Sequence, residues 1–202
     1  MKNSWKSWLC SMAMLAAAPL AGATPLIDQE ANVHAVNMAN FWQGDLAQSF
    51  QQSAATIAGA GIFLAPGMGS TDTVTISLWN NLPNAAGTML AQASVAGTAG
   101  QWADVFWSPV SIAANTTYYL VFGGNSTLSI AGDTNNGYGL GQVYANTGYQ
   151  SFANFDYAFR TFAAPVPEPT SVYLLLAGLG VLLARRQHAG KSLRVKAASQ
   201  PA

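Results

Sequence analysis

The segment after residue 164 of this 202-residue chain combines three features in a fixed order. Proline occupies alternate positions in Pro165-Val166-Pro167-Glu168-Pro169, which removes backbone donors and holds the preceding residues extended. An uncharged run from Val172 to Ala184 follows, and it is apolar on every side, as a helix facing lipid must be. Arg185 and Arg186 follow the run and are succeeded by a basic tail, residues 187–202. These positive charges favour the cytoplasmic side for the C-terminus. This order predicts an exposed, extended strip, a single C-terminal transmembrane helix and a cytoplasmic tail.

The apolar run is short for a bilayer span. At ~1.5 Å per residue, a helix from Val172 to Ala184 covers about 20 Å of the ~30 Å of hydrocarbon. Starting the helix at Pro169 and letting the arginines snorkel reduces the difference. A buried core helix is the alternative, but the proline-rich strip and the basic tail favour the membrane interpretation.

The Pro-Glu-Pro sequence, the apolar run and the arginine pair together resemble the PEP-CTERM sorting signal of Gram-negative bacteria, here residues 164–186. The resemblance implies that an exosortase, a membrane-embedded transpeptidase-like cysteine enzyme, recognises the motif. It also implies an inner-membrane-anchored precursor with its body in the periplasm. After removal of the helix, the body would reach the cell surface or the extracellular matrix. The residues of the implied sorting motif are Val166, Pro167, Glu168 and Pro169.

Residues 1–23 predict a cleaved signal peptide. Lys2 and Lys6 supply the positive start, an apolar stretch follows, and Ala21 and Ala23 form a small-x-small cleavage site around a glycine. An uncleaved anchor is disfavoured, because the apolar stretch is short and contains a proline.

Charged residues are rare in the body of the chain. Between residues 24 and 167 there are seven acids and one base, Arg160. One arginine cannot line a groove for phosphates, so the composition argues against nucleic-acid binding. The single cysteine, Cys10, lies in the leader, so the body has no disulfide, thiolate metal site or cysteine nucleophile. We expect the body to be held together by core packing and to carry no cofactor and no metal.

Short β-rich runs separated by Gly, Asn and Pro fill residues 47–163. Val74–Leu78 alternates apolar and polar, the period of a strand with one buried face. Tyr118–Phe122 has no polar member, as expected for a strand covered on both faces. This texture predicts an all-β fold, an antiparallel, jelly-roll-like β-sandwich over 47–163. Residues 24–46 are predicted to be irregular, with a short helix around Glu30 to Asn40. The nine expected strands are Ala47–Gln52, Ile57–Leu64, Val74–Asn80, Met89–Val95, Trp102–Trp107, Thr117–Phe122, Leu128–Ala131, Gly141–Tyr144 and Asp156–Phe162.

The order of several segments is also similar to that of bacterial extracellular modules of the carbohydrate-binding and lectin-like type. The similarity lies in Gln48-Ser49-Phe50, Val74–Trp79 with the Pro83 turn, Trp102–Val110, Asn115–Val121 and Asp156–Thr161. It implies a fold more than an activity.

Residues suited to catalysis are scarce. His34 is the only histidine of the body; no nucleophile elbow accompanies it, and we interpret it as a solvated side chain. Asp104 and Asp156 are the only acids within aromatic strands, and nothing in the sequence indicates that they face each other, as glycoside hydrolysis requires. We interpret Asp156 as a structural partner of Arg160 or a turn acceptor. The loop 133–137 lacks the ligand pattern of a calcium loop, although an oxygen-only structural calcium stays open. We therefore expect no catalytic residue and no enzyme.

Aromatic side chains are more promising for binding. Trp79 falls on the opposite strand phase from the apolar residues of its strand, and three tyrosines lie in the Gly- and Asn-rich region 132–150. Rings beside amides suit a sugar, whose apolar face stacks while its hydroxyls pair. The alternative is that the rings cover the second sheet face or fill loops. The candidate glycan-binding residues are Trp79, Tyr138, Tyr144 and Tyr149.

Three functional hypotheses follow. The first is an exported, exosortase-sorted surface or matrix protein with a structural or adhesive β-sandwich. The second is a glycan-binding, lectin-like module for exopolysaccharide. The third is a polysaccharide-active hydrolase or lyase.

Overall fold

The computed structural model describes residues 25–125, 127–164 and 176–180. The predicted signal cleavage site (Ala21, Ala23), the sorting motif from Val166 to Pro169, Arg185, Arg186 and the tail 187–202 lie outside the described residues. Of the run from Val172 to Ala184, residues 176–180 are described, and they form a helical turn with exposed side chains. In the described part of the chain, no helix has both the length and the apolar character needed to cross a membrane.

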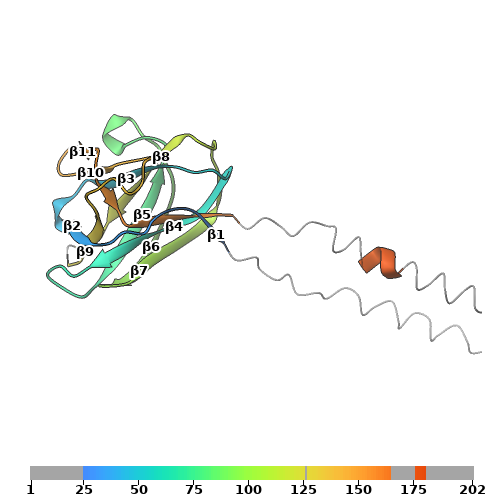
Figure 1. Cartoon of the computed structure of the whole chain (residues 1–202), viewed down its shortest axis with the longest axis horizontal. Helices are drawn as coiled ribbons and strands as arrows, with labels where there is room; N and C mark the ends of the chain where they lie inside the picture. The colour runs from blue at the N-terminus through green and yellow to red at the C-terminus, as the bar shows by residue number, and fades with distance from the viewer. Residues whose placement is uncertain (1–24, 126, 165–175, 181–202) are drawn as a thin grey trace, which may run out of the picture. The chain divides into compact units, whose positions relative to one another are not determined.

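The body is built from two antiparallel β-sheets packed as a sandwich (Figure 1). The larger sheet runs in the order β1-β13-β4-β9-β12, with β7 also pairing with β4 and β2 with β9. The smaller sheet runs in the order β11-β10-β3-β8-β5-β6. The all-β antiparallel sandwich is thus confirmed, while its assignment to the jelly rolls stays a prediction. The strands are β1 Leu26–Ala31, β2 Val36–Asn40, β3 Leu46–Gln51, β4 Thr56–Ala65, β5 Thr71–Trp79, β6 Met89–Thr98, β7 Trp102–Ser111, β8 Thr117–Gly123, β9 Ser129–Asp133, β10 Val143–Ala145, β11 Gln150–Phe152, β12 Asp156–Tyr157 and β13 Phe159–Ala163; two 3-10 turns are η2 Phe41–Gln43 and η3 Pro83–Ala85.

The core lies between the sheets and is filled by alternate residues of each strand. In β8, buried and half-buried residues alternate along the whole strand, as the two-residue period of a pleated strand requires. The prediction that Tyr118–Phe122 is covered on both faces is therefore wrong, because only one face of the strand is buried. Tyr119 and Val121 lie on the outer face and are half-buried, because that face carries neighbouring side chains but no second sheet.

Residues 25–46 contain the strands β1 and β2 where the sequence predicts an irregular segment, and the short helix expected around Glu30 to Asn40 is not present there. Strand β1 pairs with β13, and β2 pairs with β9. Both strands take their hydrogen-bond partners from segments about a hundred or more residues away, so local sequence carries little sign of them. Tertiary pairing overrides the weak local preference.

Candidate functional site

Two of the predicted glycan-binding rings lie on the same outer face of the smaller sheet. Trp79 pairs across strands with Tyr119, and the ring centroid of Tyr119 lies 5.7 Å from that of Tyr144. We call Trp79, Tyr119 and Tyr144 the β8 row. Sequence reasoning misses Tyr119, because its run of apolar neighbours predicts a strand covered on both faces. Only the cross-strand register reveals its place between the two predicted rings.

Tyr138 is not part of an exposed platform. Its side chain is buried, with its ring edge-on to Phe159 at 5.0 Å, and burial raises the pKa of its phenol. Its hydroxyl donates to Gln29 Oε1 at 3.0 Å and accepts from the backbone N–H of Gln51 at 3.2 Å. The Gly- and Asn-rich context of Tyr138 indicates a surface loop, but its phenol is instead buried and packs in the core.

Tyr149 is half-buried in the turn that its backbone N–H closes on the carbonyl of Asn146. Burial, followed by the nearby charge of Asp45, raises the pKa of its phenol. Among the described side chains it forms no aromatic pair with the β8 row. The structure therefore brings together Trp79 and Tyr144, and neither Tyr138 nor Tyr149 joins them.

The two acids considered for glycoside hydrolysis lie on opposite faces of the larger sheet. Asp156 is buried between the sheets, where it accepts from Gln48 Nε2 at 3.0 Å and from the backbone N–H of Tyr138 at 2.8 Å. Burial raises the pKa of this carboxyl against those hydrogen bonds, and the charge of Asp133 raises it further. Asp104 lies on the outer face, so the two carboxyls do not face each other. Within the described ranges, no three His, Cys, Asp or Glu side chains gather as a metal site would require.

The interpretation of Asp156 as a partner of Arg160 is wrong, because the arginine pairs with Asp104. Arg160 Nε donates to Asp104 Oδ1 at 2.8 Å, and its Nη2 donates to Asp104 Oδ2. Two parallel bonds of this kind are a strong and oriented arrangement. The strand is interrupted at Ala158, between β12 and β13. Asp156 and Arg160 therefore lie on different faces of the sheet, although they are only four residues apart.

Two glycines of β4 make this contact possible. Gly61 pairs with Asp104 of β7 on one side and with Arg160 of β13 on the other. A Cβ at Gly61 would lie 2.0 Å from Asp104 Oδ1, and one at Gly59 would lie 2.7 Å from Phe106 Cδ1. On its outer face, β4 therefore has no side chains at Gly59 and Gly61, and side chains from β7 and β13 meet above these two positions.

Around the ion pair, the outer face of the larger sheet is aromatic. Phe106 packs against Phe162 with centroids 4.9 Å apart, and Phe63 meets Trp102 edge-on at 5.6 Å. The ring of His34 stacks on Phe63 at 4.0 Å and 6°; this histidine is exposed, as predicted, but it is part of a cluster. The Arg160 guanidinium carbon lies 4.3 Å from the Trp102 centroid, a cation–π distance. We call this surface the β4 face; its members are His34, Phe63, Trp102, Asp104, Phe106 and Arg160, together with the buried Phe162 that packs against Phe106.

One sign of the β4 face is visible in the sequence itself. Gly59, Gly61 and Phe63 fall on one phase of β4, so the strand has two consecutive bare positions on that side. Glycine within a strand often marks the close approach of another group. What the spacing cannot show is which neighbouring strands supply the covering side chains.

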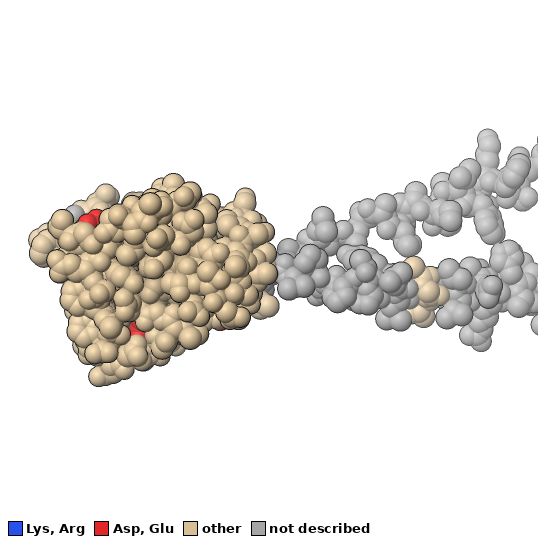
Figure 2. All heavy atoms as spheres, turned by 90° about the horizontal axis from the view of Figure 1, so that it is seen from above, with Lys and Arg blue, Asp and Glu red and all other residues tan. Residues whose placement is uncertain are grey.

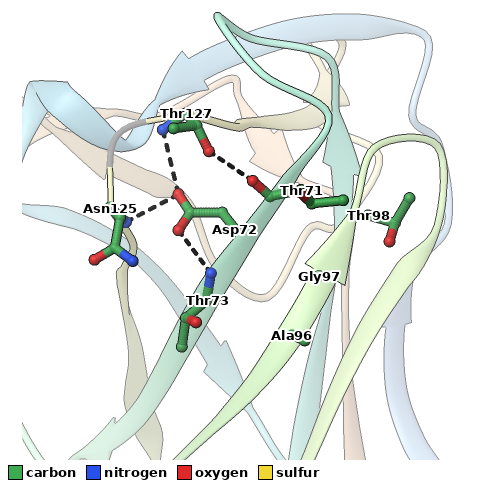
Figure 3. Close-up of a pocket in the computed structure, with 8 residues that line it drawn as sticks. All are labelled: Thr71, Asp72, Thr73, Ala96, Gly97, Thr98, Asn125 and Thr127. Atoms are coloured by element: carbon green, nitrogen blue, oxygen red, sulfur yellow. Dashed lines mark hydrogen bonds between the residues drawn. The ribbon is translucent and has the colours of Figure 1, made fainter.

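A polar hollow of about 460 Å³ lies between the β5–β6 hairpin and the connection that follows β8 (Figure 3). The Asp72 carboxylate accepts from the backbone N–H groups of Thr73 at 2.6 Å, Asn125 at 2.9 Å and Thr127 at 3.2 Å. The hydroxyl of Thr127 donates to the carbonyl of Thr71 at 2.9 Å. Both oxygens of Asp72 are occupied by the protein itself, so we interpret the hollow as a loop clamp and not as a site.

Removing this clamp should loosen the loop without unfolding the body. We expect Asp72→Ala to cost about 1–2 kcal/mol, because charge-assisted hydrogen bonds are lost from a half-exposed carboxylate. Hydrogen exchange at the amides of Asn125 and Thr127 should accelerate, while that of the core strands stays slow. Asp72→Asn is the matched control and should lose less, since it keeps one acceptor. Unchanged exchange at these amides in the alanine variant would show that the clamp is not needed.

Comparison with curated proteins and with solved structures found no match for this chain. The lectin-like similarity of the body therefore stays a prediction. A family model for the PEP-CTERM protein-sorting motif matches residues 165–187, which confirms the resemblance seen in the proline-rich strip, the apolar run and the arginine pair. This motif indicates an exported protein that is anchored in the membrane as a precursor and sorted by an exosortase.

Proposed function

We propose that the body is a structural and adhesive module, not an enzyme, which holds to the extracellular polymer matrix once the exosortase has released the protein. Its delivery to the cell surface is what the sorting motif indicates. The adhesive role is supported by aromatic groups on the outer faces of both sheets. The non-catalytic role is supported by the hydrogen bonds that the aspartates of the body accept.

Every aspartate of the body accepts hydrogen bonds from the protein, and this observation carries the proposal. A general acid or nucleophile must reach substrate, whereas these carboxylates bind backbone N–H groups, amides, a hydroxyl or the one arginine. Figure 2 shows one face of the body, on which very few charged side chains are visible. The aspartates are Asp28, Asp45, Asp72, Asp104, Asp133 and Asp156.

The hydrolase or lyase alternative is less well supported. Its two candidate acids, Asp104 and Asp156, lie on opposite faces of the sheet, and each is bound within the protein. The glycan-binding alternative is compatible with the adhesive role, because a matrix of polysaccharide is held by binding sugars. We treat it as the chemistry through which adhesion occurs.

Retention on matrix isolated from the host tests the proposal. We expect the mature protein to sediment with purified extracellular polymer and to stay bound in 1 M salt, where the screening length is about 3 Å. Contacts made by rings and neutral hydrogen bonds persist under these conditions, whereas a charge-based attachment does not. Incubation with the polymer should release no new reducing or unsaturated ends. Loss of retention in salt, or cleavage of the polymer, would contradict the proposal.

A further inference from the structure

We propose that the β4 face is the surface that binds polysaccharide, and that its ligand is an uncharged polymer lying along strand β4. This inference rests on the adhesive function proposed above and names its chemical partner and its place in the fold. Three properties of the face carry it: the order of its groups, the unused donors of Arg160 and the local charge.

The groups of the β4 face repeat along the strand in three cross-strand rungs. Phe106 and Phe162 flank Gly59, Asp104 and Arg160 flank Gly61, and Trp102 pairs with Phe63. Successive rungs are two residues apart, about 7 Å along a strand, so three rungs extend over about 14 Å. Phe162 is buried and packs against the exposed Phe106. A chain of sugar rings along β4 therefore meets Phe106 at one end, Trp102 at the other and a hydrogen-bonding pair in the middle. Stacking with central polar contacts is the arrangement that an amphipathic sugar requires.

The middle rung retains hydrogen-bonding capacity. A guanidinium carries five N–H groups, and Arg160 directs Nε–H and one Nη2–H at Asp104. Among the described residues, its side chain forms no other hydrogen bond. The side chains of Arg160 and Asp104 are 19% and 26% exposed, so water or a ligand can reach them. Sugar hydroxyls, which both donate and accept, match a guanidinium and a carboxylate held side by side.

The charge around this rung favours an uncharged polymer over an acidic one. Asp104 already neutralises Arg160, and Glu30 lies opposite Arg160 in the pairing of β1 with β13. The described body contains no other Lys or Arg. An anionic sugar would therefore approach a surface of net negative charge and be repelled.

The β8 row on the other sheet is a weaker candidate, because its polar tips are engaged. The Trp79 indole N–H donates to Ser77 Oγ at 2.9 Å, and Gln142 Nε2 donates to the Tyr144 hydroxyl at 2.9 Å. The face also serves as a matched control, because it offers a tryptophan in a strand of the opposite sheet.

Affinity electrophoresis of the mature, exported protein tests the inference. The gels contain xyloglucan, dextran or polysaccharide from the host matrix, and alginate serves as the acidic probe. We expect retardation by an uncharged polymer or by the host polysaccharide, and none by alginate. Phe106→Ala and Trp102→Ala should each weaken retardation about tenfold or more through loss of a stacking ring, while Trp79→Ala should match the parent. Arg160→Lys keeps the positive charge but loses the planar guanidinium with its paired N–H donors, and it should weaken retardation several-fold.

The outcomes separate this inference from the proposed function. Phe106→Ala is expected to stay folded, because Phe106 is 52% exposed. Near-UV circular dichroism verifies that the variants are folded. If folded Phe106→Ala and Trp102→Ala variants bind the host polysaccharide like the parent, the inference is wrong although the adhesive function stands. Loss of binding in Trp79→Ala alone would assign the ligand to the β8 row, and retardation by alginate alone would overturn the uncharged ligand. If the parent protein does not bind the host polysaccharide at all, the proposed function fails as well.

Discussion

Replacing Glu168 by alanine is expected to leave essentially all of the precursor uncut and held in the inner membrane. Glu168 is the only charged residue between Arg160 and Arg185, and it lies within the matched sorting motif. From the sequence, proline on both sides predicts an extended strip, in which we expect an enzyme to contact the carboxylate. Losing that group removes the charged feature of the motif while leaving the apolar run and the arginines intact. Intact mass and membrane fractionation of the protein from its host measure the result.

Two further variants sharpen this experiment. Thr170→Ala, two residues away and outside the Pro-Glu-Pro sequence, is the matched control and should be processed like the parent. Glu168→Gln keeps the shape of the side chain without its charge, so its processing shows whether the enzyme recognises charge or shape. Normal cleavage and export of the alanine variant would show that the exosortase does not need Glu168 to recognise the protein.

The fold class follows from the sequence because the sandwich has one dominant signal, the two-residue alternation of buried and outward side chains. That alternation places Ile76 and Leu78 in the core and Trp79 on the outer face, as the structure shows. The same reasoning does not recover β1 and β2. Their alternation is weak, and their stability comes from pairing with strands near the other end of the body.

The candidate site is less predictable than the fold, because side-chain partners across strands depend on register. Proximity in sequence pairs Arg160 with Asp156, but its partner Asp104 lies two strands away across Gly61. The glycines and asparagines around Tyr138 predict a surface position, yet its phenol fills the core. Composition predicts which residues are available for binding; only the pairing of strands decides which of them meet.

The opposite faces of the larger sheet should respond very differently to the loss of a phenylalanine ring. Phe159 is fully buried and lies 6.3 Å from Phe50 and 5.0 Å from Tyr138, measured between ring centroids. We expect Phe159→Ala to lower the free energy of unfolding by about 3–5 kcal/mol, since lost burial and a residual cavity add. Phe106→Ala, on the outer face, should cost about 1 kcal/mol or less. Urea unfolding of a 24–165 fragment, which is one compact unit, measures both.

The comparison distinguishes a core ring from a binding ring within one sheet. A loss of 3–5 kcal/mol is a large fraction of the ~5–15 kcal/mol that stabilises a typical domain, so Phe159→Leu, with an expected loss of about 1–2 kcal/mol, provides a variant that stays folded. Equal losses at positions 159 and 106 would mean that the outer face is a second core and not a free surface. A small loss at Phe106 together with weakened polysaccharide binding is the combination that a ring exposed for ligand stacking requires. Stability and retention, measured on the same variant, therefore decide between packing and binding at the β4 face.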